Sequence, residues 1–195
     1  SSCTSTATTS SCSPVIFAVE LFNLLPKIYI ASKFNKKIIN DTEFTLEDDF
    51  RTKLIGEEKN FKYFNNSSFI KDKNGNLKYQ YLGPFYNEMA SNGELTSNIC
   101  EEVVKIENKL IDKCDIFAVY LDENISPGSI TELTYASLKE KEIIIFYKKE
   151  NEVCYELKSS NWYPIVSAKM ISKNNKVKVI PVSSEDDIIN YFFNN

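Results

Sequence analysis

The stretch at residues 115–148 reads "DIFAVYLDENISPGSITELTYASLKEKEIIIFYK", and it decides the fold. It opens and closes with near-continuous apolar runs, at 115–121 and 142–148. Such runs are typical of strands that are covered on both faces. The segment between them, 129–141, has the pattern of a helix. A strand–helix–strand unit with buried strands predicts a parallel sheet with helices on both faces.

The segments on either side extend the same pattern. "KIYIA" at 27–31 and "KVKVIPV" at 176–182 are short and apolar, so they are predicted to be further strands. A closing helix is predicted at 183–193, with Ser183 or Ser184 as its cap. Another helix is predicted at 95–114, because apolar residues there are spaced by four, three and four: Ile99, Val103, Ile106 and Leu110. We therefore expect an α/β fold with a flavodoxin-like or Rossmann-like, mostly parallel sheet.

The rest of the chain departs from this alternation. Residues 1–13 form a Ser/Thr/Cys tract that we expect to be disordered, and 14–25 are apolar, as in a helix or an extra strand. Residues 26–195 are expected to form a single α/β domain. Within it, residues 33–93 are rich in Asn, Lys, Phe and Tyr and are interpreted as a long insertion after the first strand. The sequence "DKNGN" at 72–76 indicates a turn or hairpin there.

Composition narrows the function classes. The net charge of −4 argues against a nucleic-acid polymer as the main partner. No stretch approaches the roughly 18 apolar residues that mark a membrane span. The five cysteines form no C-x-x-C motif, which fits a reducing compartment and predicts a cytoplasmic protein. The sequence contains no histidine, which excludes Ser-His and Cys-His nucleophile pairs and His-ligated metals within the chain. Carboxylates, Tyr, Lys or a bound cofactor would have to carry any catalysis.

Glu132 has two interpretations. The residues Ser129-Ile-Thr-Glu132 match the S-x-x-E capping box, in which Glu132 would only cap a helix. The motif also follows a buried strand, and ligands of open parallel sheets bind beyond the carboxyl ends of the strands. Pro127 and Gly128 make the turn, and the helix start supplies backbone donors. A carboxylate in that place can attack an electrophilic sugar carbon.

The sequence here resembles a known family. "KIYIAS" at 27–32 and the residues from about 99 to 148 resemble the nucleoside 2-deoxyribosyltransferase family and its nucleoside 5′-monophosphate N-glycosidase relatives. Residues 128–136 fit the family pattern G-x-x-x-E-L/I-x-x-A. The resemblance does not cover the first 25 residues or the 33–93 segment.

The resemblance implies catalytic roles. Glu132 would be the nucleophile that holds the deoxyribosyl group. Tyr29 would contact the nucleophile or the sugar; its alternative is a core aromatic residue. Glu107 would protonate the departing base, although many members have Asp there and Glu is one methylene longer. Alternatively, Glu107 only lies on the solvated flank of its helix. Asn108, next to it, is another candidate for the role at the base. Asp115 is expected to anchor the start of its strand.

The resemblance also implies substrate-binding residues. Some transferases have an acid at the position of Ser126 that binds a sugar hydroxyl. Asp122 or Glu123, further back on the loop, could replace it. Ser126, Gly128 and Ser129 would bind a 5′-phosphate. Apart from the resemblance, the aromatic residues of the 33–93 segment, Phe85, Tyr81 and Tyr86, can stack on a nucleobase; their alternative is simple packing.

The implied activity is cleavage of the N-glycosidic bond of a nucleoside or nucleotide, with transfer of the sugar to another nucleobase or to water through a glycosyl-Glu intermediate. No metal or cofactor is expected. The protein is expected to form a homodimer or a larger homo-oligomer. An NAD glycohydrolase of the TIR type and a non-catalytic nucleotide-sensing module remain alternatives. The sequence does not decide which base is released, or whether the sugar is ribose or deoxyribose. It also does not decide whether a 5′-phosphate is needed, or whether the sugar is transferred to a base or to water.

Overall fold

The structure, a computed structural model, describes most of the chain from residue 24 onward. The described residues are 24–33, 37–39, 43–45, 49–56, 68–84, 97–151, 156–172 and 176–195. Residues 1–23 lie outside this set, so the expectations for the Ser/Thr/Cys tract and for most of the apolar 14–25 segment remain predictions. Phe85 and Tyr86 lie outside it as well.

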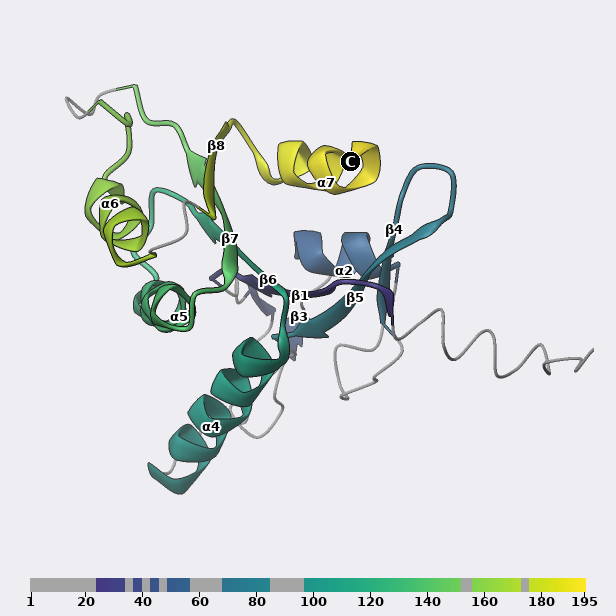
Figure 1. Ribbon diagram of the computed structural model, residues 1–195, viewed down its shortest axis with the longest axis horizontal. Coiled ribbons are helices and arrows are strands. Elements are labelled where there is room, and N and C mark those ends of the chain that lie inside the picture. The colour runs from purple at the N-terminus through teal and green to yellow at the C-terminus, as the bar shows by residue number, and fades with distance from the viewer. Residues whose placement is uncertain are drawn as a thin grey trace, which may run out of the picture.

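One six-stranded sheet, ordered β4-β5-β1-β6-β7-β8, forms the centre of the molecule (Figure 1). Five strands run parallel, and the edge strand β4 is antiparallel to β5. This confirms the expected mostly parallel α/β sheet and the expected neighbours β1, β6 and β7. The strands are β1 (Lys27–Ala31), β4 (Phe69–Lys71), β5 (Leu77–Gly83), β6 (Ile116–Leu121), β7 (Glu142–Lys148) and β8 (Val177–Val182).

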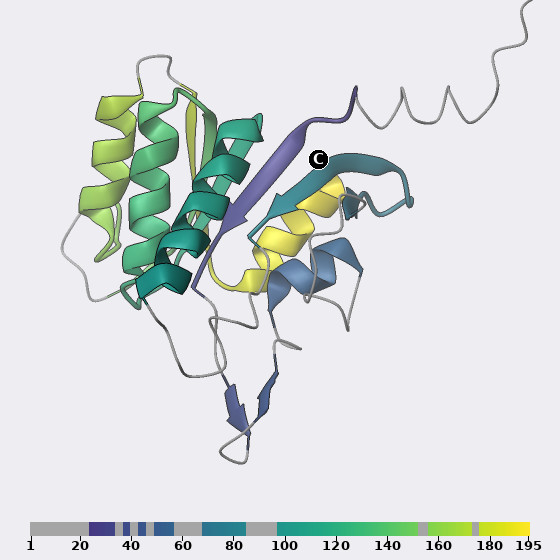
Figure 2. The same cartoon turned by 90° about the horizontal axis from the view of Figure 1, so that it is seen from below.

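Helices cover both faces of this sheet, as the pattern predicts (Figures 1 and 2). Three helices pack on one face: α4 (Ser97–Lys113), α5 (Pro127–Leu138) and α6 (Trp162–Ile171). Two helices pack on the other: α2 (Phe50–Ile55) and α7 (Glu185–Asn194). A separate antiparallel pair consists of β2 (Lys37–Ile39) and β3 (Glu43–Thr45). None of the helices in the described ranges is long and apolar enough to cross a membrane.

The central strand β6 belongs to both cores, because successive side chains of a strand point to opposite faces. Phe117, Val119 and Leu121 pack in the core under α4, α5 and α6. Ile116, Ala118 and Tyr120 pack in the core under α2 and α7. All six residues are buried, which is the physical reason for the apolar run in the sequence.

The long insertion predicted at 33–93 is not confirmed. Strand β5 lies inside that range and pairs directly with β1 in the main sheet, and β4 forms the edge beside it. The predicted turn at 72–76 joins β4 to β5, and the Asp72 carboxylate accepts from the amides of Asn74 and Asn76. β5 escaped prediction because it is only partly buried and carries Lys78 and Gln80, so it lacks a continuous apolar run.

Helix α6 was also not predicted. Pro164 stands in its first turn, where a missing amide hydrogen removes no intrahelical bond, so the proline is tolerated. The helix buries Ile165 and Ala168 against the sheet. At the other end of the chain, Ser184 forms a capping box with Asp187, which confirms one of the two predicted caps of α7.

Candidate active site

Two predicted site residues meet at the carboxyl edge of the sheet, where the parallel strands end. Tyr29 is fully buried on β1, and Glu132 lies in the second turn of α5. The Tyr29 hydroxyl donates a hydrogen bond to Oε1 of Glu132. The predicted convergence of these two side chains is therefore confirmed. The tyrosine ring also stacks on Phe117 of β6, with centroids 5.7 Å apart, which fixes its direction.

The capping-box interpretation of Glu132 is wrong. Helix α5 begins at Pro127 with Ser126 as its N-cap, three residues before the cap that the S-x-x-E pattern requires. Proline favours the first helical position because its missing amide hydrogen costs nothing there. The hydroxyls of Ser126 and Ser129 bond to each other at 2.9 Å, and no side chain caps the helix start. Glu132 therefore has no capping role, and its carboxylate accepts a hydrogen bond from Tyr29 instead.

The surroundings of Glu132 bring the pKa of its carboxyl group close to neutral pH. Burial, followed by the neighbouring Glu107 carboxylate, raises the pKa of Glu132 to about 7, against the opposing effects of the Tyr29 hydrogen bond and Arg51. Burial and then Glu132 raise the pKa of Tyr29 well above its usual value, so the tyrosine stays a neutral donor. A carboxyl group with a pKa near the working pH is suited to chemistry.

Glu107 supplies a second carboxyl group to the same place. It is partly buried on α4, and burial raises its pKa while Arg51 opposes this. Within the described residues its carboxyl group makes no hydrogen bond or ion pair. Its charge raises the pKa of both Glu132 and Tyr29, so it lies within electrostatic reach of them. Two neighbouring carboxyl groups of raised pKa tend to share a single proton, because both cannot ionise easily together.

Arg51 is a site residue that the sequence reasoning missed. It lies on α2, is fully buried and is paired with Asp49 through Nε–Oδ1 (2.8 Å) and Nη2–Oδ2 (2.6 Å). Its Nη1 donates to the carbonyl oxygens of Ile30 and Ser32 at the end of β1. The pattern Asp-x-Arg at 49–51 is a weak local signal, and it stood in the segment interpreted as an insertion. Its charge lowers the pKa of both Glu132 and Glu107.

The predicted phosphate-binding residues lie together at the start of α5. Ser126 is the N-cap, and Gly128 and Ser129 are in the first turn. Gly128 is exposed, and a Cβ added to it would meet nothing within 4 Å. The exposed backbone at Gly128 and the partly exposed Ser126 therefore leave this helix start open to an anion, with the buried Ser129 hydroxyl behind them.

Asp122 and Tyr81 have other hydrogen-bond partners than this pair. Asp122 accepts from the amide and the side chain of Asn124, and it lines a cleft beside α7 instead. Tyr81 is fully buried, and its hydroxyl donates to the carbonyl of Pro84, so it is a core residue and not a stacking surface. Asn108 is partly buried on α4 beside Glu107.

Asp115 has the structural role expected of it. The backbone amide of Lys27 donates to its carboxylate at 2.7 Å, which joins the starts of β1 and β6. This bond lies directly before the paired residues Ile28 and Ile116 and so supports the register of the two strands.

The comparisons with known proteins add little to this geometry. No family model matches the chain, and no curated protein matches it. One solved structure that it resembles is the CMP N-glycosidase BcmB of Clostridium botulinum, at 22% identity and a TM-score of 0.37. The match covers 47% of this chain and 72% of that one. This likeness carries no argument about function, so the site is interpreted from its own residues.

Proposed function

We propose that this protein cleaves the N-glycosidic bond of a nucleoside 5′-monophosphate or nucleoside, with Glu132 as the nucleophile. One observation carries the proposal: a buried tyrosine holds Glu132 at the carboxyl edge of a parallel sheet, with Glu107 beside it. Retaining glycosidases use such a pair, one carboxylate under the sugar and one carboxylic acid at the leaving group. The family resemblance of residues 128–136 points to the same chemistry.

The reaction follows from the two carboxyl groups. An ionised oxygen of Glu132 attacks C1′ of the sugar, the bond from C1′ to the base nitrogen breaks, and Glu107 gives its proton to the departing base. A glycosyl ester on Glu132 remains. Water or a second nucleobase then attacks C1′, gives its proton to Glu107, and frees Glu132.

This sequence of steps requires the shared proton to sit on Glu107 when Glu132 attacks. Tyr29 and Arg51 favour the anion on Glu132, since a donated hydrogen bond and a nearby cation both stabilise a carboxylate. No hydrogen-bond donor among the described residues contacts Glu107. Tyr29 therefore serves both to orient the nucleophile and to keep it ionised.

The helix start at 126–129 supports a phosphate-bearing substrate. Its first-turn amides and the hydroxyls of Ser126 and Ser129 would hold a 5′-phosphate beside Glu132. Gly128→Ala tests this subsite, because the added methyl meets no protein atom but would stand where the phosphate binds. We expect the KM for a nucleotide to rise while that for the matching nucleoside and the melting temperature stay unchanged.

The deciding experiment is base release measured by chromatography. Wild type and Glu132→Gln are incubated with dCMP, CMP, deoxycytidine and NAD, with and without added adenine to detect transfer. Gln keeps the shape and loses the charge, so release should fall by at least about a thousandfold, roughly 4 kcal/mol of transition-state stabilisation. Glu107→Gln should slow substrates with poor leaving bases most.

Each alternative has its own outcome in this experiment. Release of nicotinamide alone would support an NAD glycohydrolase. No release from any of the four substrates would overturn the proposal, and nucleotide binding measured by calorimetry would then support a sensing module. Release that survives in Glu132→Gln would remove Glu132 from the chemistry.

A further inference from the structure

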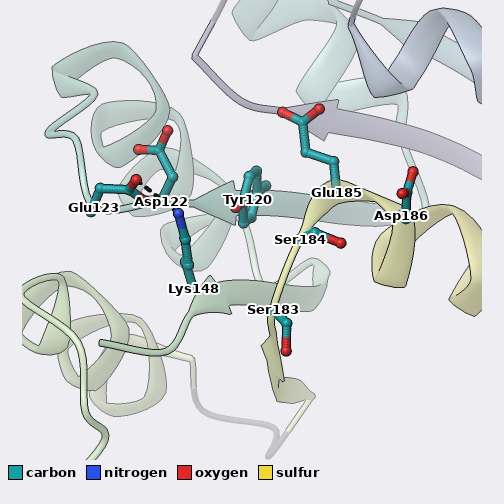
Figure 3. A pocket seen from close by; sticks show the side chains of 8 residues that line it. All are labelled: Tyr120, Asp122, Glu123, Lys148, Ser183, Ser184, Glu185 and Asp186. Atoms are coloured by element: carbon teal, nitrogen blue, oxygen red, sulfur yellow. Dashed lines mark hydrogen bonds and ion pairs between the residues drawn. The ribbon is translucent and has the colours of Figure 1, made fainter. Parts of the chain in front are cut away.

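A cleft lies at the same edge of the sheet, on the side of α7. It has a volume of about 420 Å³ and is formed where β6, β7 and β8 end (Figure 3). Tyr120 of β6 lies on the sheet face opposite to Tyr29, because the two side chains belong to different cores. The residues that matter for its chemistry are Tyr120, Asp122, Glu123, Lys148, Glu185 and Asp186.

The cleft carries an excess of negative charge. Lys148 pairs with Glu123 at 2.8 Å, so these two charges offset each other. The carboxylates of Asp122, Glu185 and Asp186 make no ion pair with any described residue. Four carboxylates and one ammonium group leave a net charge of −3 around the cleft. Anionic ligands such as phosphates are therefore repelled from it.

Tyr120 adds an unpartnered hydroxyl. Its side chain is only 6% exposed, and its ring packs edge-on against Phe50 of α2 at 6.1 Å. Its hydroxyl makes no hydrogen bond with any described residue, yet the side chain lines the cleft. Figure 3 shows it between the loop after β6 and the first turn of α7. This oxygen is not fully buried, so a ligand in the cleft can reach it.

We propose that this cleft binds a small organic cation that carries amine groups. The three carboxylates would attract the ammonium groups, and the Tyr120 oxygen would accept a hydrogen bond from one of them. Such a ligand would neutralise the excess negative charge and give the Tyr120 hydroxyl a hydrogen-bond partner. The proposal does not depend on the activity proposed for Glu132.

A metal ion fits the cleft less well. Within the described residues, no group of three or more acidic, His or Cys side chains is arranged to hold a metal. Ca²⁺ and Mg²⁺ need oxygens gathered at about 2.0–2.6 Å from one point. A chain with several amines can reach carboxylates that stand further apart.

The state of Glu185 supports the same ligand class. Burial raises its pKa, and the negative charges of Asp49 and Asp122 raise it further against Arg51 and Lys53. Like charges are thus crowded near the first turn of α7. A bound cation would relieve this repulsion, so binding should weaken as Glu185 takes up its proton.

Isothermal titration calorimetry with spermidine at low ionic strength tests the proposal. Glu185→Gln removes one charge of the cleft, and Tyr120→Phe removes only the hydroxyl. Glu102→Gln on the exposed face of α4 changes the net charge of the protein equally and is the matched control. We expect affinity to fall at least about fivefold in Glu185→Gln and about threefold in Tyr120→Phe, and to stay unchanged in the control.

Three results would overturn the proposal. The first is the absence of measurable spermidine binding to the wild type. The second is an equal loss of affinity in Glu185→Gln and Glu102→Gln, which would show a diffuse effect of net charge. The third is that Mg²⁺ displaces spermidine as effectively as a competing amine does at the same ionic strength.

Discussion

At the scale of single residues, Glu132 is held in a state that costs stability. Burial and Glu107 raise its pKa to about 7, so the folded protein binds the proton more tightly than the unfolded chain does. The stability that protonated Glu132 contributes to the folded state is fully present below about pH 4.5. It is lost as the pH rises through about 7. Sites that hold reactive groups commonly trade stability for activity in this way.

Glu132→Gln should therefore be more stable than wild type in alkaline solution. Because one pKa unit corresponds to about 1.4 kcal/mol, the gain at pH 8 is on the order of 2–3 kcal/mol. It should vanish below pH 4.5, where the wild-type residue is protonated in both states. Urea unfolding at pH 4.5, 6 and 8 measures this, with Glu102→Gln as the control. A stability difference that does not change with pH would contradict it.

Tyr29→Phe should move the acid limb of the pH–rate profile to higher pH. In the wild type the hydrogen bond from Tyr29 lowers the pKa of Glu132. Removing the hydroxyl therefore raises that pKa, so Glu132 ionises only at higher pH. Base release should fall at least about tenfold near pH 6 and less near pH 8. Tyr135→Phe is the control, because it removes a tyrosine hydroxyl that bonds Asp112 outside the site. An acid limb that does not move would show that Tyr29 only packs.

At the scale of elements, the buried Arg51 of α2 links this helix to the end of β1. Arg51 bridges Asp49 and two carbonyls of the strand that carries Tyr29. Removing one partner of such a pair leaves an uncompensated buried charge. Arg51 thus links the placement of a helix to the geometry and charge of the site.

Arg51→Met should destabilise the protein by about 3–5 kcal/mol, because Asp49 is left buried and unpaired. Asp49→Asn combined with Arg51→Met should recover part of this loss, since neither charge then remains. Thermal and urea unfolding of the single and double variants give the comparison. Equal stability of wild type and Arg51→Met would mean that Arg51 does not hold α2 to β1.

The elements also show what the sequence can and cannot predict. β1, β6 and β7 were predictable because their burial on both faces produces apolar runs. β5 was missed because Lys78 and Gln80 interrupt its pattern at the less buried side of the sheet. The start of α5 was misplaced because Ser-x-x-Glu imitates a capping box, whereas Pro127 begins the helix earlier. Arg51 could not be found because its partners on β1 are about twenty residues away and only the fold brings them together.

At the scale of the whole molecule, the described surface carries apolar side chains that water would not favour. Tyr163, Val166 and Met170 are exposed at i, i+3 and i+7 of α6, and Leu138 is exposed at the end of α5. The family resemblance implies a homodimer or larger assembly, and such side chains are a suitable contact surface.

We expect a homodimer in solution at micromolar concentration. Light scattering coupled to size exclusion measures its mass directly. Met170→Lys should shift the equilibrium toward monomer, because it places a charge within the apolar surface, while Lys169→Gln on the same helix should not. A purely monomeric wild type would refute the expectation.

The hydrogen bond between Tyr29 and Glu132 joins residues 103 positions apart in the chain. Closing so long a loop is slow, because its entropy is lost before the contacts that β1 makes with β6 can form. Helical signal should therefore return early during refolding, and base release should return late, together with the β1–β6 pairing. The chemistry would then report the completion of folding, since a partly folded chain with every helix in place would still lack its site.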